Sequence, residues 1–195
     1  MALDKLGAQR INDYDTDASP QAIKCRTHYE QTRDALIESH VWRFATGRAA
    51  LSQDTVDPDF EYDNQFILPT DYLVKKSVWN GSGPRSATFS YAIEGDRLLT
   101  NESAIYLRYM KRVTDPTKFN PLFVEVLVLK LALKLVSLAG ANPKMSEALG
   151  IELRGVMPQV RTMSRQETEN IGREDRAAWA DIRVSSGPAW RSRRV

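Results

Sequence analysis

The sequence contains few of the residues on which metal sites and acid–base catalysis depend. It has one cysteine, Cys25, and two histidines, His28 and His40, in 195 residues. A single cysteine forms neither an internal disulfide nor a multi-thiolate zinc site. Since His40 is expected near the C-terminus of a helix, the macrodipole predicts a structural cation there. The composition therefore argues against metal chemistry and fits a reducing compartment.

Net charge and long hydrophobic runs are also limited. The formal net charge is +2, with 27% charged and 42% hydrophobic residues, so no general attraction to nucleic acid or membranes is implied. The most apolar stretch, 121–141, is interrupted by Glu125, Lys130 and Lys134. Charges at mid-span are costly in a bilayer. We therefore predict a buried helix there and no membrane contact.

Catalytic motifs are missing as well. Gly81-Ser82-Gly83-Pro84 lacks the lysine and the following helix of a phosphate-binding loop, and no Gly-x-Ser-x-Gly elbow occurs. Acidic pairs such as Asp57 with Asp59 give no converging metal-binding set, and a solvated surface explains them. We predict a protein that is not an enzyme, with no catalytic, cofactor-binding or metal-binding residues.

Three helix starts share one pattern, in which a capping side chain precedes a proline. The pairs are Ser19-Pro20, Asn120-Pro121 and Asn142-Pro143. The cap accepts a bond from an orphan N–H, and proline loses nothing at the first helical position. Helices are therefore predicted over 20–39, over 121–139 and from 143 towards 170.

Other helical features are less regular. A short helix is expected over 2–11 from its apolar spacing. Gly150, Gly155 and Pro158 weaken the last helix, and Pro158 is expected to kink or break it. The helix over 121–139 is apolar around most of its surface, which predicts a central core element.

Residues 42–112 have the pattern of short β-strands. Strands are predicted over 72–78, 88–93 and 97–99, with a hairpin turn at Glu94-Gly95-Asp96. The segment 104–112 carries bulky side chains on both faces, which predicts a strand covered on both sides.

The predicted fold is α+β and mainly α. A helical bundle would comprise 1–41 and 113–172, a β-rich insertion 42–112, and an extended C-terminal arm 173–195. The bulky aromatic residues Trp42, Phe44, Phe119 and Phe123 are expected to pack where helices meet strands.

The C-terminal arm supplies candidate assembly contacts, because tryptophan and arginine are enriched at interface anchors. These residues are Trp179, Trp190, Arg191, Arg193 and Arg194. The arginine cluster leaves a second function open, namely a nucleic-acid-binding module that contacts phosphates.

An ordered set of residues resembles the tail tubular protein A family, the head-to-tail adaptors of short-tailed bacteriophages. No single motif is specific, and the order and spacing of the set carry the resemblance over about three quarters of the chain. The set comprises 15–20, Cys25, Tyr29, Arg33-Asp34, Leu36, His40, Trp42, Phe44-Ala45, Arg48-Ala49, Leu51, Leu68-Pro69, Asp71-Tyr72-Leu73, Tyr109, Arg112-Val113, Asp115-Pro116, Phe119, Pro121, Phe123 and Leu131-Ala132.

The resemblance implies a structural protein of the virion neck, assembled in the host cytoplasm. Copies would form a ring, typically twelvefold, between the portal protein and the tail nozzle protein. The ring would leave a channel through which double-stranded DNA passes without sequence recognition. The family has no catalytic residues and no cofactor. The chain departs from its pattern at Val41, where a proline is common, and in the tail after Gly172.

Overall fold

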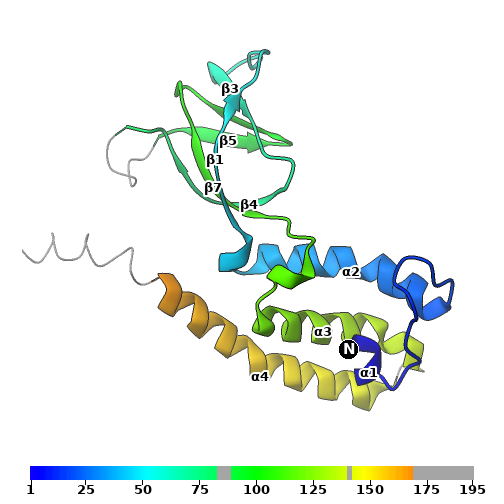
Figure 1. Cartoon of the computed structure of the whole chain (residues 1–195). Helices are drawn as coiled ribbons and strands as arrows, with labels where there is room; N and C mark the ends of the chain where they lie inside the picture. Colours follow the sequence, from blue (N-terminus) through cyan, green and yellow to red (C-terminus); the bar gives the residue numbers. More distant parts are fainter. Residues whose placement is uncertain (83–88, 140–141, 169–195) are drawn as a thin grey trace, which may run out of the picture.

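The computed structural model describes residues 1–82, 89–139 and 142–168. Within these residues the chain forms four α-helices and two small antiparallel sheets, so the predicted α+β class is confirmed. The helices pack together at one end and the strands project from them (Figure 1). The helices are α1 (Ala2–Lys5), α2 (Pro20–Ser39), α3 (Pro121–Leu135) and α4 (Pro143–Thr168), with 3-10 turns η1 (Arg43–Ala45), η2 (Pro116–Lys118) and η3 (Val136–Ala139).

All three predicted helix starts are capped as expected. The Ser19 hydroxyl accepts a bond from the backbone N–H of Ala22 at 3.3 Å. The Asn120 side-chain oxygen accepts one from Leu122 at 2.8 Å, and that of Asn142 accepts one from Lys144 at 3.1 Å. Each cap satisfies a backbone donor that has no partner inside its helix.

The first helix is much shorter than the predicted 2–11. The N–H of Ala8 bonds to the carbonyl of Leu3, and the N–H of Gly7 bonds to that of Asp4. These two bonds form a Schellman motif, which ends the helix. It requires the left-handed φ of +63° that Gly7 adopts. The prediction followed apolar spacing and overlooked this glycine stop.

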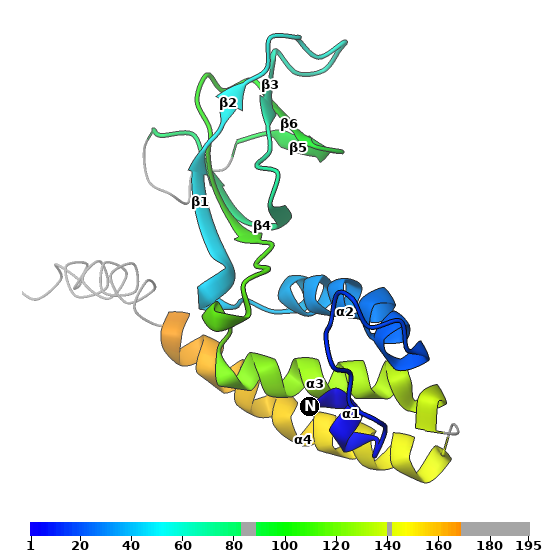
Figure 2. The ribbon, with the colours of Figure 1, turned by 45° about the vertical axis from the view of Figure 1, so that its right-hand side comes forward.

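Helix α3 is the centre of the helical part, as predicted. It packs against α1, α2 and α4, and Figure 2 shows it between α2 and α4. Phe123, Val126, Leu129, Ala132 and Leu135 on this helix are fully buried, with 0% exposure. No helix in the described part of the chain is both long enough and apolar enough to cross a bilayer.

Helix α4 continues through Pro158, so the predicted break is wrong, while the kink predicted as its alternative stays a prediction. Pro158 lies on the exposed side of the helix, where water can solvate the carbonyl that loses its amide donor. On the opposite side Leu149, Val156 and Val160 are buried in the core. Their burial holds the helix together where propensity alone would end it.

The strands form two sheets with a core of their own. The three-stranded sheet has the order β1 (Thr46–Ala50), β7 (Tyr106–Lys111), β4 (Tyr72–Trp79). The four-stranded sheet has the order β2 (Ser52–Gln53), β3 (Asn64–Ile67), β6 (Arg97–Thr100), β5 (Tyr91–Glu94). Phe66, Leu68, Leu98, Ile105 and Leu107 are the main buried residues between them.

The strands predicted over 72–78, 97–99 and 104–112 are close to β4, β6 and β7, whereas the one predicted over 88–93 starts only at Tyr91, and its residue 88 lies outside the described residues. Strands β1, β2 and β3 were not predicted individually. The β5–β6 hairpin turns at Gly95, with φ +57°, as predicted. Strand β7 is covered differently from the prediction. Leu107 and Tyr109 enter the sheet core and Met110 enters the helical core, whereas Tyr106 is 44% exposed. On the second face of β7, Met110 is buried beside the helices, Arg108 is half-buried and Tyr106 is the most exposed of the three.

Candidate assembly site at the helix–sheet junction

The four aromatic residues predicted to pack at the junction lie in one cluster. The ring of Phe123 is 5.0 Å from that of Trp42 and 4.9 Å from those of Phe44 and Phe119. Phe123 meets Trp42 at 87° and Phe44 at 75°, the edge-to-face geometry that aromatic pairs favour. Phe123 is fully buried and Trp42 nearly so. The cluster joins α3 to the chain that leads into the sheets.

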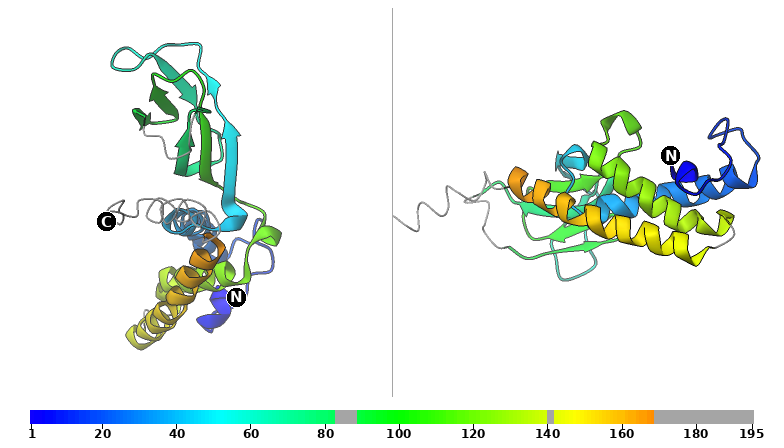
Figure 3. Two further views of the ribbon diagram at one scale, coloured as in Figure 1. Left: turned by 90° about the vertical axis from the view of Figure 1, so that its left-hand side faces the viewer. Right: turned by 90° about the horizontal axis from the view of Figure 1, so that it is seen from below.

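Short polar contacts fix the cluster from both sides. The Trp42 indole N–H donates to the carbonyl of Leu36, near the end of α2, at 3.0 Å. On the other side, the Asp115 carboxylate accepts a bond from the N–H of Thr117 at 3.0 Å and so caps η2. Both entry and exit of the β region are therefore anchored beside α3. Figure 3 shows β1 rising directly from this point.

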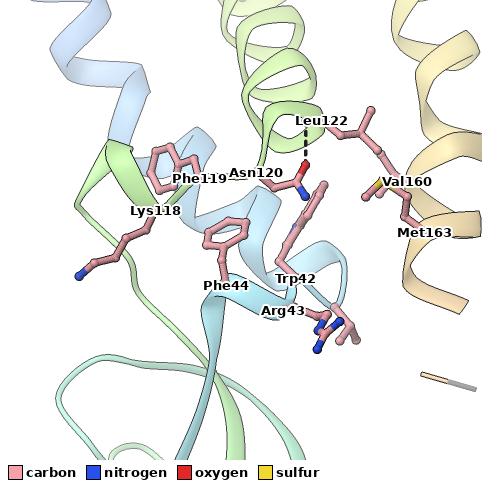
Figure 4. Close-up of a pocket in the computed structure, with 10 residues that line it drawn as sticks. Trp42, Arg43, Phe44, Lys118, Phe119, Asn120, Leu122, Val160 and Met163 are labelled. Atoms are coloured by element: carbon pink, nitrogen blue, oxygen red, sulfur yellow. Dashed lines mark hydrogen bonds between the residues drawn. The ribbon is translucent and has the colours of Figure 1, made fainter. Parts of the chain in front are cut away.

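A hollow of about 370 Å³ opens beside the cluster. Trp42, Phe44 and Phe119 lie on one side of it, and Val160 and Met163 of α4 lie on the other (Figure 4). Arg43 and Lys118 are exposed at its edge. The described residues that line it include no carboxylate, cysteine or histidine. The hollow is therefore lined mainly by apolar side chains and can accept another one.

His40 does not fit the predicted structural cation. Burial is the main effect and lowers the pKa of its imidazole, and the charge of Arg161 lowers it further. A hydrogen bond with the backbone of Val160 acts in the opposite direction. The imidazole packs edge-on to Trp42 at 5.2 Å. Desolvation beside the aromatic cluster therefore favours the neutral form of the His40 imidazole.

A carboxylate links α2 to the end of β7. Asp34 receives hydrogen bonds from Nε of Arg33 at 2.8 Å and from Nε of Arg112 at 2.9 Å. The Arg33 side chain is 5% exposed and that of Arg112 is 45% exposed. Loss of the anion costs more free energy for a buried guanidinium than for an exposed one, because water does not solvate the buried charge. Asp34 therefore both neutralises Arg33 and ties the helices to the β region.

A second carboxylate ties β4 to β7. The Tyr109 hydroxyl donates to Asp71 at 2.8 Å, and the backbone N–H of Arg112 donates to the Asp71 carbonyl at 2.6 Å. Gly47 faces Tyr109 across the sheet. A Cβ at position 47 would lie 2.9 Å from the phenol carbon, so glycine leaves the room that this ring needs.

The Tyr109 contact predicts a stability loss at high pH. Burial, and then the hydrogen bond and charge of Asp71, raise the pKa of Tyr109 to about 12. Because the folded state favours the neutral phenol, the Tyr109 contact makes its full contribution to the free energy of unfolding below about pH 10. It is lost as pH rises from 10 towards 12. Melting temperatures of the wild type and Tyr109→Phe should therefore converge over that range.

A gap between the two melting temperatures that stays constant from pH 8 to about 12 would contradict this role. Tyr14, Tyr29 and Tyr72 also have raised pKa values, mainly through burial. The comparison with Tyr109→Phe removes their shared contribution, since both proteins retain them.

The predicted arm contacts lie outside the described residues. They are Trp179, Trp190, Arg191, Arg193 and Arg194. In the described ranges no group of three or more His, Cys, Asp and Glu residues is placed to hold a metal ion. Sequence reasoning missed the Asp34–Arg112 and Asp71–Tyr109 pairs, because partners separated by 78 and 38 residues give no local signal.

Comparison with known proteins gives no family assignment. No protein-family model matches the chain, and no curated protein matches it either.

Proposed function

We propose that the chain is a head-to-tail adaptor of a short-tailed bacteriophage. In this proposal it forms a ring that joins the portal protein to the tail nozzle protein and surrounds the DNA ejection channel. It acts as a structural part of the virion neck, without catalysis. The resemblance to tail tubular protein A provides the starting point, and the geometry of the junction supports it.

The observation that carries the proposal is the convergence of the resembling residues. Arg33-Asp34, Trp42, Phe44, Asp71, Tyr109, Arg112, Asp115, Phe119 and Phe123 come from separate parts of the sequence. In the fold they form the aromatic cluster, the Asp34 link between α2 and the end of β7, the Asp71 link within the three-stranded sheet, and the cap of η2. A set that shares one structural purpose is harder to obtain by chance than scattered matches.

The described architecture suits a component that holds two partners at a fixed distance and orientation. Two hydrophobic cores, one helical and one between the sheets, are held together by the junction. A rigid junction fixes the relative placement of surfaces at the two ends. The net charge of +2 also suits a DNA channel, because strong phosphate binding would retard a passing duplex.

Co-sedimentation with the portal protein of the same virus tests the proposal. The wild-type chain is expected to sediment with portal rings in a fixed ratio of many copies per portal. Ile151→Ala, at a side chain of α4 that is 58% exposed, serves as a folded variant for comparison of yield. A folded chain that stays monomeric and never binds portal or nozzle protein would contradict the proposal.

A further inference from the structure

The loop between β2 and β3, residues 54–63, carries two large apolar side chains that are among the most exposed in the described part of the chain. Phe60 is 79% exposed and Val56 is 64% exposed. Exposed apolar side chains concentrated on one loop are typical of an interaction site. Figure 2 shows this loop projecting from the β region at the end away from the helices. The loop therefore lies apart from both the helical core and the aromatic cluster.

Polar contacts hold both ends of the loop in place. Asp54 pairs with Arg97 of β6 at 2.6 Å. At the other end, the backbone N–H of Asp63 donates to the side-chain oxygen of Asn101 at 2.9 Å. A preformed loop loses less conformational entropy on binding than a flexible one does. The loop can therefore present Phe60 to a partner at little entropic cost.

The charge of the loop limits the kind of partner. Residues 54–63 include four aspartates and one glutamate, and neither lysine nor arginine. Asp54 is paired with Arg97, whereas the other carboxylates, those of Asp57, Asp59, Glu61 and Asp63, belong to exposed residues. Such a surface repels the phosphates of nucleic acids and of anionic membranes. A fitting partner instead offers an apolar group with positive charges beside it.

The C-terminal segment of the chain, residues 182–195, has this complementary composition. It contains four arginines and neither aspartate nor glutamate. Trp190 directly precedes the cluster formed by Arg191, Arg193 and Arg194. Guanidinium groups bind carboxylates through paired hydrogen bonds and stack on aromatic rings. These residues lie outside the described ranges, and it is their composition that matches the loop.

The chain beyond α4 is also long enough to reach another copy. Helix α4 ends at Thr168, and residues 169–189 separate it from Trp190. A stretch of about 21 residues can span at most about 70–75 Å. Helix α4 itself, with 26 residues, is about 39 Å long. The available reach is therefore almost twice the length of α4, which is enough to connect neighbouring subunits of a ring.

We infer that residues 190–194 of one copy dock on the loop 54–63 of the neighbouring copy. Trp190 packs against Phe60 and Val56, and the arginines bind the exposed carboxylates. This contact rests on the proposed ring and ties its subunits together. Segment and loop are different surfaces, so the contact is head-to-tail and repeats around a closed ring. Each exposed ion pair is weak alone, but assembly holds the two surfaces at a high effective concentration.

A pair of introduced cysteines tests the contact. Thr55→Cys lies on the loop and Ser192→Cys lies between the arginines, so the apolar anchors and all the charges remain. Chains with one change each are mixed, assembled on portal rings and oxidised. We expect a disulfide-linked dimer of the two chains on a denaturing gel. The wild type should give no dimer, because its Cys25 is buried.

A matched control moves the first cysteine away from the loop. Ile151→Cys replaces a side chain of α4 that is 58% exposed, so its thiol is also accessible. Mixed with the Ser192→Cys chain, it should give roughly tenfold less dimer than Thr55→Cys gives, because the segment is not concentrated there. Melting temperatures of the cysteine variants, compared with the wild type, show that each remains folded.

Charge reversal shows whether the carboxylates and arginines make the contact. Asp59→Lys with Glu61→Lys, added to the loop-cysteine chain, should lower the dimer yield roughly tenfold, because like charges then face each other. Arg191→Glu with Arg193→Glu, added to the other chain, should have a similar effect. Mixing the two reversed chains restores opposite charges and should recover the dimer.

Several outcomes would overturn the inference. They are a dimer yield no higher than that of the control, a yield that charge reversal leaves unchanged, and a disulfide that forms only within a chain carrying both cysteines. Protection of the loop cysteine from alkylation by nozzle protein alone would identify a different occupant and overturn it too. In each case wild-type rings on the portal would leave the adaptor proposal intact. Failure of the wild type to bind portal would instead contradict the adaptor proposal.

Discussion

Replacement of Phe123 by alanine is expected to lower the free energy of unfolding by about 3–5 kcal/mol. Phe123 is fully buried and contacts Trp42, Phe44 and Phe119. Truncation removes its burial and leaves a cavity in the aromatic cluster that joins α3 to the entry of the β region. Since the total free energy of unfolding of a small domain is about 5–15 kcal/mol, the variant should melt far below the wild type.

Phe60→Ala is the matched control for this loss. It makes the same chemical change at a side chain that is 79% exposed. Its unfolding free energy should stay within about 0.5 kcal/mol of the wild-type value. Chemical denaturation of both variants, followed by circular dichroism, measures the difference. Equal effects of the two substitutions would show that the aromatic cluster does not hold the molecule together.

Replacement of Asp34 by alanine is expected to cost about 3–5 kcal/mol, because it leaves the buried Arg33 guanidinium without its anion. Arg112→Ala removes the other partner of the same carboxylate. The Arg112 side chain is 45% exposed, so Arg112→Ala should lower the free energy of unfolding by only about 0–1 kcal/mol. The asymmetry distinguishes a buried charge from a surface ion pair.

Denaturant unfolding of the two variants gives the comparison. A loss from Arg112→Ala as large as that from Asp34→Ala would mean that the link between α2 and β7 matters more than the burial of Arg33. Small losses from both would show that the Arg33 guanidinium reaches water when Asp34 is removed.

Local chemistry predicted much of the helical part. Caps followed by proline marked the starts of α2, α3 and α4, because the cap and the proline both act within one turn. Apolar surface around most of α3 indicated its central position. The same local reasoning failed at Gly7, which stops α1, and at Pro158, where packing of Val156 and Val160 keeps α4 continuous.

The β region was less accessible from the sequence. The Glu94-Gly95-Asp96 turn was found because a hairpin turn is local. The pairing of β1 with β7 and of β3 with β6 joins distant segments, and nothing in their own composition fixes that register. The aromatic residues of the junction were predictable from size alone, whereas the links through Asp34 and Asp71 were not.

Acidic residues near Phe60 illustrate a further limit. In the sequence, Asp57 and Asp59 suggest only a solvated surface. The fold adds that Phe60 beside them is 79% exposed and that Glu61 adopts a left-handed φ of +72°. The exposure of a side chain and the backbone conformation beside it become visible only when the chain is placed in space.

Electron microscopy of the wild-type chain mixed with the portal protein of the same virus addresses the adaptor proposal itself. We expect averaged images to show a closed ring of this chain stacked coaxially beneath the portal, with an open central channel. Portal rings that remain bare at saturating concentrations of a folded chain would contradict the proposal.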